Sequence, residues 1–258
     1  KKRAEIITNW INNYCKSASY KPKALIVGIS GGIDSSVVST LCAGTGRKTI
    51  VLTMPIKQIK SQHDLSLSHA KWLKQKYKNV EHHLLEMDKI FTSFSQVLTK
   101  FNNDHGYANS RARLRMATLY QVAAANNGIV VGTGNKVEDF GVGFYTKYGD
   151  GGVDLSPIAD LLKTEVYGVA KYLNIIESIQ VAPPTDGLWS DNRTDQQQIG
   201  VDYDELEWAM NELEKNPSMK GLTPKQTKTI QIYLNFNRQN QHKMNPIPVC
   251  EIPIEFLV

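Results

Sequence analysis

The sequence predicts an α/β fold in which a parallel sheet carries helices on both faces. Short β-branched apolar runs alternate along the chain with longer segments whose apolar residues recur at helical spacing. With 258 residues, 41% of them hydrophobic, the chain can bury the core of one large domain. The first apolar run leads into a Gly-Gly loop that opens a helix, and right-handed crossovers place such a loop at the carboxyl edge of the sheet.

The first half of the chain alternates helix and strand. An amphipathic helix over residues 3–15 precedes the first strand, which runs from Leu25 to Ile29 and is rich in β-branched residues. Pro55 closes the second strand, because proline cannot donate to a ladder. We expect further helices over 36–43, 62–77, 87–99 and 107–127, and further strands over 49–54, 82–85 and 129–131.

The second half is predicted to consist of helices and loops. Residues 140–157 are rich in glycine and should form an extended loop. Pro183-Pro184 begins a polar, turn-rich segment that continues to about Gly200 and is expected to be mobile. Helical spacing returns over 163–173, 203–214 and 224–239.

We expect one domain over residues 1–258, with an N-terminal helix (1–20), a core (21–243) and an irregular tail (244–258) that carries three prolines. No apolar run approaches the length of a membrane span, and the N-terminus lacks the apolar centre of a signal peptide. Neither a membrane nor a secretory route is therefore expected.

Cysteine usage and charge limit the function further. The three cysteines are scattered and form no C-x-x-C pair, which argues against a zinc site or a disulfide framework and fits a reducing cytoplasm. The net charge of +5 is modest, and no long block of lysine and arginine occurs. We therefore expect small polyanionic substrates and no nucleic acid.

The loop at residues 30–36, Ser-Gly-Gly-Ile-Asp-Ser-Ser, has the features of a phosphate cradle. Its glycines let backbone N–H groups approach an anion, and the start of a helix adds partial positive charge. The spacing and the lysine of a Walker A loop are missing. Serines that only cap the helix would explain the Gly-Gly turn about equally well. Asp34 favours the cradle, because an acid beside bound phosphates normally implies a bridging metal.

Three arginines occupy the helix expected over 107–127. Arg111 and Arg115 lie one turn apart, whereas Arg113 points about 200° away from Arg111 and should share a face with Met116. An arginine on an apolar face needs an anionic partner. We therefore expect Arg113 to grip a phosphate or carboxylate, in preference to a structural ion pair, and the other two to be solvated or salt-bridged.

The fourth predicted strand ends in Gly-Thr, so Thr133 should lie at the sheet edge where ligands bind. Glu138 and Asp34 offer hard oxygen ligands and would together hold Mg²⁺ if the fold brings them close. Alone, Glu138 would more often be a solvated helix residue.

The densest signal is the run Tyr-Thr-Lys-Tyr-Gly-Asp-Gly-Gly-Val-Asp over residues 145–154. So many glycines with two acids suit a ligand-binding loop better than a scaffold. Lys163 begins the next helix, where a cation opposes the helix dipole, so we expect an anionic partner such as a phosphate there.

In this order and spacing, these motifs closely resemble the ammonia-dependent NAD synthetases over about residues 25–243. That family belongs to the N-type ATP pyrophosphatases, which share the loop at 30–36, whereas the run at 145–154 is distinctive for the family. The resemblance implies a Rossmann-like fold of the adenine nucleotide alpha hydrolase type, usually in a homodimer. It also implies a ligase that amidates deamido-NAD with ATP, Mg²⁺ and ammonia through an acyl-adenylate, giving NAD, AMP and pyrophosphate.

The resemblance assigns roles to single residues. Asp34 and Glu138 would bind Mg²⁺, Asp150 would hold or deprotonate the ammonium, and Asp34, Asp150 and Lys163 would serve catalysis. ATP and the pyrophosphate would contact Gly28, Ile29, Ser30, Gly31, Gly32, Ile33, Asp34, Ser35, Thr133, Lys163 and Thr185. Deamido-NAD would contact Arg113, Lys147, Asp154, His242 and Lys243, with Tyr120 and Phe144 as further contacts.

Two features depart from the family. Gln196 stands where the family often has the glutamate of a Gln-x-Asp-Glu segment, which puts any contact by that acid in doubt. One extra residue separates Glu138 from the Thr-Lys-Tyr-Gly-Asp motif, relative to some members. Neither departure touches the phosphate loop.

Other functions compete with this one. A GMP synthetase-like subunit shares the loop and would use xanthylate in place of deamido-NAD. An ATP-binding regulatory module of the same fold would need the loop but not Asp150, Asp154 and Lys163 together. The scattered cysteines disfavour the tRNA-thiolating relatives. No glutaminase signature appears, so we expect ammonia to be taken free or from a partner.

Overall fold

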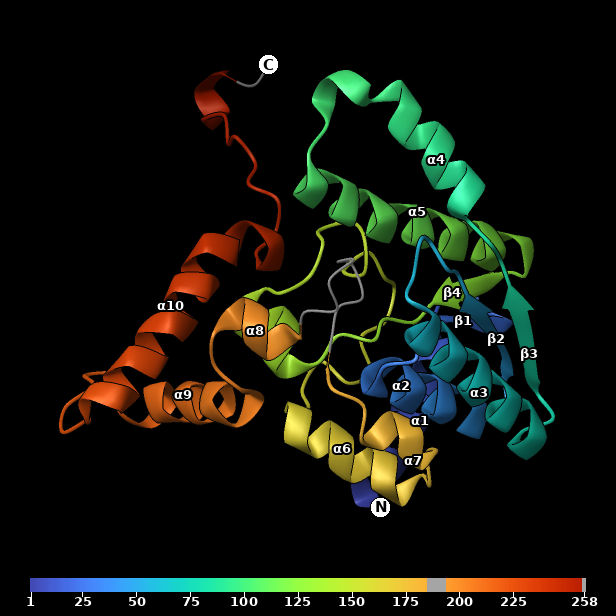
Figure 1. Cartoon of the computed structure of the whole chain (residues 1–258), viewed down its shortest axis with the longest axis horizontal. Coiled ribbons are helices and arrows are strands. Elements are labelled where there is room, and N and C mark those ends of the chain that lie inside the picture. Colours follow the sequence, from blue (N-terminus) through green and yellow to red (C-terminus); the bar gives the residue numbers. More distant parts are fainter. Residues whose placement is uncertain (185–193, 257–258) are drawn as a thin grey trace.

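The computed structural model describes residues 1–184 and 194–256. Its centre is a parallel sheet with strand order β3-β2-β1-β4 (Figure 1). The fold class predicted from the sequence, a parallel sheet between layers of helices, is confirmed. The strands are β1 (Ala24–Gly28), β2 (Lys48–Thr53), β3 (Val80–Leu84) and β4 (Gly128–Val130).

The first strand is apolar on both sides because both sides are covered. Leu25 and Val27 pack into one core, whereas Ala24 and Ile26 pack into the other. Successive side chains of a strand point to opposite faces, so a run without polar residues is the pattern of a strand between two layers.

Helices of the two layers come from different parts of the chain (Figure 1). One core is built on α1 (Lys2–Ser17), α2 (Ile33–Gly44), α3 (Lys60–Lys76), α6 (Lys163–Tyr172) and α7 (Glu177–Gln180). The other is covered by α4 (Asp88–Val97) and α5 (Asp104–Ala125), with the short turn η1 (Thr99–Phe101) between them.

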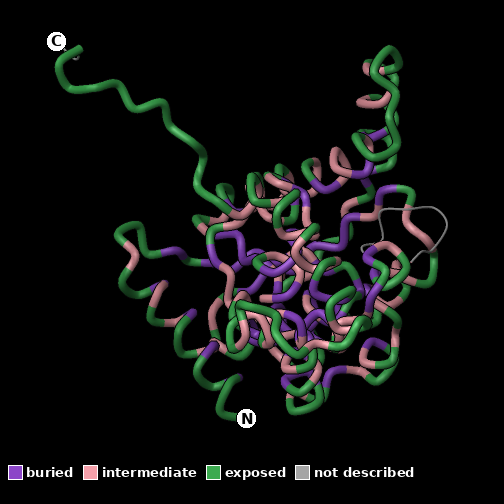
Figure 2. Tube along the Cα trace, turned by 90° about the vertical axis from the view of Figure 1, so that its left-hand side faces the viewer, coloured by how far each residue is buried: buried purple, intermediate pink, exposed green. Residues whose placement is uncertain are grey.

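A third apolar cluster, which includes Val137, Val142, Ile199 and Leu206, lies beside the sheet domain. It joins a π-helical turn, η2 (Lys136–Val142), to α8 (Asp195–Ile199), α9 (Tyr203–Lys215) and α10 (Pro224–Met244). The chain then runs out as an arm that ends in η3 (Ile254–Phe256) and stands away from the body (Figures 1 and 2). In residues 1–184 and 194–256, every helix is too short or too polar to span a bilayer.

The structure differs from the sequence prediction in several elements. The extended loop expected over 140–157 is wrong for residues 140–142, which close the π-helical turn. The helix α7 was not expected, and α8 lies inside the segment predicted to be turn-rich. The middle of that segment, 185–193, lies outside the described residues, so the expectation of mobility stays a prediction there.

The arginines of α5 are arranged differently from the prediction. Arg113 is exposed, whereas Arg115 runs inward and donates from Nε to the Met54 carbonyl at 2.9 Å. Burial, and then the neighbouring Arg111 charge, lower the pKa of Arg115 to about 10. The expected burial of Arg113 is therefore wrong, whereas its grip on a phosphate or carboxylate stays a prediction.

Helix α9 fixes the first turn of α6. Glu207 is buried and accepts two hydrogen bonds from Thr164, at 2.8 Å from the backbone N–H and at 2.7 Å from the hydroxyl. Glu165 adds a bond of 3.0 Å from the Leu162 N–H to its own carboxylate. The backbone of Lys163 is therefore held from both sides.

We predict that Glu207→Ala lowers the free energy of unfolding by about 1–3 kcal/mol, because the Thr164 amide and hydroxyl lose a buried acceptor. Urea unfolding measures the change. Glu214→Ala is the matched control, because Glu214 is exposed on the same helix, and it should stay within about 0.5 kcal/mol of the wild type. Equal losses in the two variants would contradict this assignment.

Candidate active site

The loop between β1 and α2 is shaped by its own serines. The Ser35 hydroxyl accepts from the Ser30 N–H at 3.2 Å and donates to the Gly32 carbonyl at 3.1 Å. The Ser36 hydroxyl donates to the same carbonyl at 2.8 Å. The serines therefore stabilise the loop backbone, but none of them caps the helix, since the N-cap is Gly32 without a side-chain bond, and a bound anion would share these hydroxyls with the loop.

Gly31 allows the loop to lie directly against α3. Its φ of +91° falls in the left-handed region that favours glycine. A Cβ at this position would lie 2.7 Å from the Gln62 carbonyl oxygen and 2.9 Å from the Ser66 nitrogen. Both neighbours are backbone atoms of α3, so they cannot rotate away.

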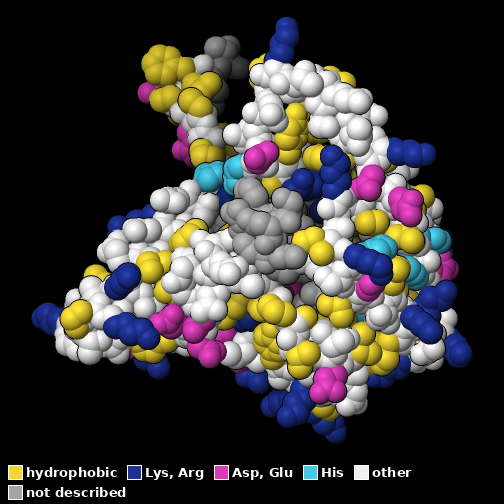
Figure 3. All heavy atoms as spheres, viewed as in Figure 1, with side chains coloured by type: hydrophobic (Ala, Val, Ile, Leu, Met, Phe, Trp, Pro, Cys, Tyr) yellow, Lys and Arg dark blue, Asp and Glu magenta, His cyan; other side chains and the backbone are white. Residues whose placement is uncertain are grey.

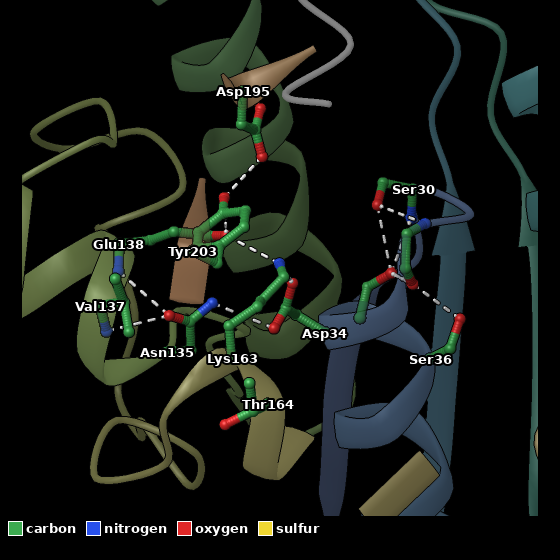
Figure 4. A network of polar contacts seen from close by, with 12 residues as sticks. Ser30, Asp34, Ser36, Asn135, Val137, Glu138, Lys163, Thr164, Asp195 and Tyr203 are labelled. Carbon is green, nitrogen blue, oxygen red and sulfur yellow. Dashed lines mark hydrogen bonds and ion pairs between the residues drawn. The ribbon is translucent and has the colours of Figure 1, made fainter. Parts of the chain in front are cut away.

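The Lys163 ammonium lies between two carboxylates (Figure 4). Its Nζ is 2.6 Å from Asp34 Oδ2 and 2.7 Å from Glu138 Oε1, and its side chain is only 4% exposed. Burial disfavours the charged lysine, but the two carboxylates outweigh burial and raise the pKa of Lys163. The lysine is therefore charged at neutral pH, and it brings together the start of α2, η2 and the start of α6.

Two further side chains fix the carboxylates. The buried Asn135 amide donates to Asp34 Oδ1 at 3.1 Å, and its oxygen accepts the Val137 and Glu138 N–H groups, each at 3.0 Å. The Tyr203 hydroxyl of α9 lies 2.5 Å from Glu138 Oε1. Sequence reasoning missed both side chains. The position of Asn135 after a strand ending in Gly-Thr-Gly was a signal for the first, whereas nothing in the sequence pattern marked the second.

Asp34, Glu138 and Lys163 line one cavity of about 560 Å³ at the carboxyl end of the sheet. Its wall combines the phosphate loop, α3, α5, the end of β4 and the segment after η2. Among the predicted residues, the cavity brings together Gly28, Ile29, Ser30, Gly31, Gly32, Ile33, Asp34, Ser35, Thr133, Glu138, Phe144, Asp150 and Lys163.

Two acids, Asp139 and Asp150, also line the cavity. Desolvation within this deep site raises the pKa of both acids, and the Asp150 charge raises the pKa of Asp139 further. The Asp150 carboxylate is oriented by the Thr146 N–H, which donates to its Oδ1 at 3.0 Å. This part of the cavity therefore favours a cationic ligand, whereas the phosphate loop favours an anion.

Comparison with known proteins decides the family. The family model described as NAD synthase matches residues 4–247. The chain belongs to the NAD synthase family. It is 33% identical to the NH(3)-dependent NAD(+) synthetase of Staphylothermus marinus, over 98% of this chain and 92% of that protein.

Solved structures agree with this assignment. An NMN synthetase from Francisella tularensis superposes with a TM-score of 0.84 at 28% identity, over 97% of this chain and 98% of that chain. An NH3-dependent NAD synthetase from Campylobacter jejuni superposes with a TM-score of 0.78, also at 28% identity and with the same coverage. Both likenesses span the sheet domain and the α9–α10 region together.

The family resemblance singled out further residues. As far as the structure describes them, these residues do not line the cavity. The Arg113 Nε donates to the Lys147 carbonyl at 3.2 Å, and Lys147 Nζ donates to the His242 carbonyl. Lys243 Nζ donates to the Gly143 carbonyl at 2.9 Å. These cations gather between α5 and α10, beside the cavity.

Asp154 also lies away from the cavity. Its carboxylate accepts from the Tyr120 hydroxyl at 3.0 Å and from the Val130 N–H at 2.8 Å. Burial, and then the bond to Asp154, raise the pKa of Tyr120 to about 12. Tyr120 and Asp154 of the same chain therefore support the end of β4. Thr185 lies outside the described residues.

Asp34 and Glu138 fit a magnesium ion. Their oxygens already converge on one cation, the Lys163 ammonium, and carboxylate oxygens are the ligands that Mg²⁺ prefers. No group of three or more His, Cys, Asp or Glu side chains arranged for a metal occurs in residues 1–184 and 194–256. Protein oxygens from two residues suit an ion that also takes oxygens from water and a nucleotide.

We predict that Gly31→Ala disrupts the loop, because the added methyl group would meet α3 backbone at an unfavourable φ. Strain of this kind costs of order 1–3 kcal/mol. ATP affinity, measured by calorimetry, should fall at least tenfold. Gly46→Ala is the control: it also has a positive φ of +75°, but a Cβ there meets nothing within 4 Å. Unchanged ATP affinity in Gly31→Ala would contradict the close packing described above.

Proposed function

We propose that this NAD synthase family member amidates deamido-NAD with ammonia at the expense of ATP, giving NAD, AMP and pyrophosphate. The observation that carries the proposal is the Lys163 ammonium held by Asp34 and Glu138 beside the phosphate loop, in a cavity that also exposes Asp150. Anion-binding and cation-binding groups thus share one chamber, and a reaction of ATP with ammonia needs both.

In the first half-reaction, the nicotinate carboxylate attacks the α-phosphorus of ATP, and pyrophosphate leaves. A free carboxylate is a poor acyl donor because its leaving group would be oxide, and the resulting acyl-adenylate carries AMP as a leaving group instead. The phosphate loop would hold the β- and γ-phosphates at the start of α2, and Lys163 would offset the charge that develops on them. Mg²⁺ on Asp34 and Glu138 would supply further charge neutralisation when bound.

In the second half-reaction, ammonia attacks the activated carbonyl and AMP leaves. Ammonium must first lose a proton, because its nitrogen has no lone pair. Asp150 is the proposed base, since burial raises its pKa toward the range of a useful proton acceptor and Thr146 orients its carboxylate.

The size of the amidated nucleotide is a second question, raised by one comparison. The structure with a TM-score of 0.84 is described as an NMN synthetase, whereas the NAD synthetase reaches 0.78. Nicotinate mononucleotide carries the same carboxylate as deamido-NAD and lacks its adenylate half. Amidation of the mononucleotide is therefore the second candidate function, and a direct comparison of kcat/KM for the two nucleotides decides between them.

We also propose that the enzyme is a homodimer. The end of α4 exposes Val97 (82%), η1 exposes Phe101 (77%), and the C-terminal arm exposes Ile254 (83%) and Phe256 (72%). Hydrophobic side chains gather on this arm, which stands clear of the body (Figure 3). A second copy would cover such surfaces. A cytoplasmic location is part of the proposal, because the three cysteines are free thiols, which persist in reducing compartments.

We expect that the protein forms NAD, AMP and pyrophosphate in equal amounts when it is given deamido-NAD, ATP, Mg²⁺ and ammonium. Liquid chromatography with mass detection measures all three products. Xanthylate in place of deamido-NAD should give no product, which separates the reaction from that of a GMP synthetase. Binding of ATP without release of pyrophosphate would favour a regulatory module and overturn the proposal.

The two half-reactions can be separated at Asp150. We predict that Asp150→Asn slows NAD formation by about 10²–10⁴-fold, the usual contribution of a general base, while pyrophosphate release stays within a few-fold of the wild type. A single-turnover experiment with and without ammonium measures both steps. Equal loss of the two half-reactions would rule out a role of Asp150 in ammonia chemistry.

A further inference from the structure

We propose that Tyr203 is a positioning residue, which keeps Glu138 directed at the metal once Lys163 turns from the carboxylates to the phosphates of ATP. The inference rests on the proposed function, because it assumes a magnesium ion at Asp34 and Glu138. Tyr203 itself need not touch the metal or the nucleotide.

The geometry gives Glu138 two partners on one oxygen. Lys163 Nζ lies 2.7 Å from Oε1, and the Tyr203 hydroxyl lies 2.5 Å from the same atom (Figure 4). The two partners come from different helices, α6 and α9, and therefore can be lost separately. Removal of the lysine leaves the tyrosine contact in place.

Lys163 cannot keep its present contacts when the site is loaded. Its ammonium occupies the point on which the Asp34 and Glu138 oxygens converge, so a metal shared by these oxygens must displace it. Two carboxylates against one ammonium leave a net negative charge, which favours the entry of a divalent cation. The displaced ammonium lines the same cavity as the phosphate loop and would pair with the β- and γ-phosphates.

Tyr203 is suited to hold the carboxylate alone. Its ring packs in the cluster of Val137 and Leu206, so the helix that carries it is fixed to η2. Its hydroxyl also lies 2.6 Å from Asp195 Oδ2, so Glu138 and Asp195 share its single proton (Figure 4). Partners of this kind, which orient a ligand without binding the metal, typically change metal affinity by about 10–100-fold when they are removed.

The proposal therefore predicts a change in metal affinity. The variant Tyr203→Phe tests the contribution of the hydroxyl alone. The change deletes only the hydroxyl and leaves the ring, which lies 4.9 Å from the Lys163 ammonium. Free Mn²⁺ is counted by electron paramagnetic resonance in titrations of the full chain that hold α,β-methylene-ATP at saturation. The expected result is about 10–100-fold weaker Mn²⁺ binding. In turnover, the Mg²⁺ requirement should rise while kcat at saturating Mg²⁺ stays near the wild-type value.

Tyr233→Phe is the matched control, because Tyr233 packs in the same apolar cluster and loses the same atom. It should bind Mn²⁺ like the wild type, whereas a general loosening of the cluster would weaken both variants alike. Tyr203→Leu provides a second variant without the hydroxyl if Tyr203→Phe does not fold. Wild-type Mn²⁺ affinity in either folded Tyr203 variant overturns the proposal.

The variant Asp34→Asn shows whether a negative result concerns the role of Tyr203 or the proposed metal site itself. If Asp34→Asn binds Mn²⁺ as tightly as the wild type, the metal does not lie at Asp34 and Glu138, and both proposals fall. If Asp34→Asn loses Mn²⁺ while Tyr203→Phe retains it, only the role of Tyr203 is wrong.

Discussion

One buried ammonium connects the parts of this molecule that matter for chemistry. Lys163 binds Asp34, 129 residues earlier in the chain, and Glu138, 25 residues earlier. The sheet sets the position of α2, the third apolar cluster sets that of η2, and Glu207 of α9 sets the first turn of α6. One helix layer thus contributes Asp34 and Lys163, the third apolar cluster holds η2 with Glu138, and the three charges meet at the cavity.

The sheet was predictable because its physical signal is local. A strand such as β1 is apolar at every position only when both of its faces are covered, so its sequence reports the layer above and the layer below together. The arginines of α5 show where such reasoning ends. Helical periodicity placed Arg113 on a different face from Arg111 and Arg115, but packing decided which face turned inward. When a helix carries apolar residues on several sides, the elements that pack against it decide which side is buried.

For the candidate site, the sequence indicated which residues lie together better than it indicated which of them contact each other. The resemblance to a family placed Asp34, Glu138 and Lys163 at one ligand, yet the direct bridge between them appears only in three dimensions. Tyr203 carried no signal at all, because it reaches Glu138 across 65 residues and from a helix whose pattern predicts only an apolar face. The π-helical turn escaped prediction for a related reason: the buried Asn135 side chain caps its first N–H groups.

Stability alone does not explain why such a cluster is retained. Burying two carboxylates and an ammonium costs desolvation energy that their attraction repays only in good geometry, and apolar replacements of such clusters are often no less stable. The arrangement makes sense as a site built in advance. With the lysine between them, the carboxylates stay converged and hydrogen-bonded, so a metal held by Asp34 and Glu138 would require an exchange of cations and little movement of the ligands. The lysine released in such an exchange would then be available to the phosphates.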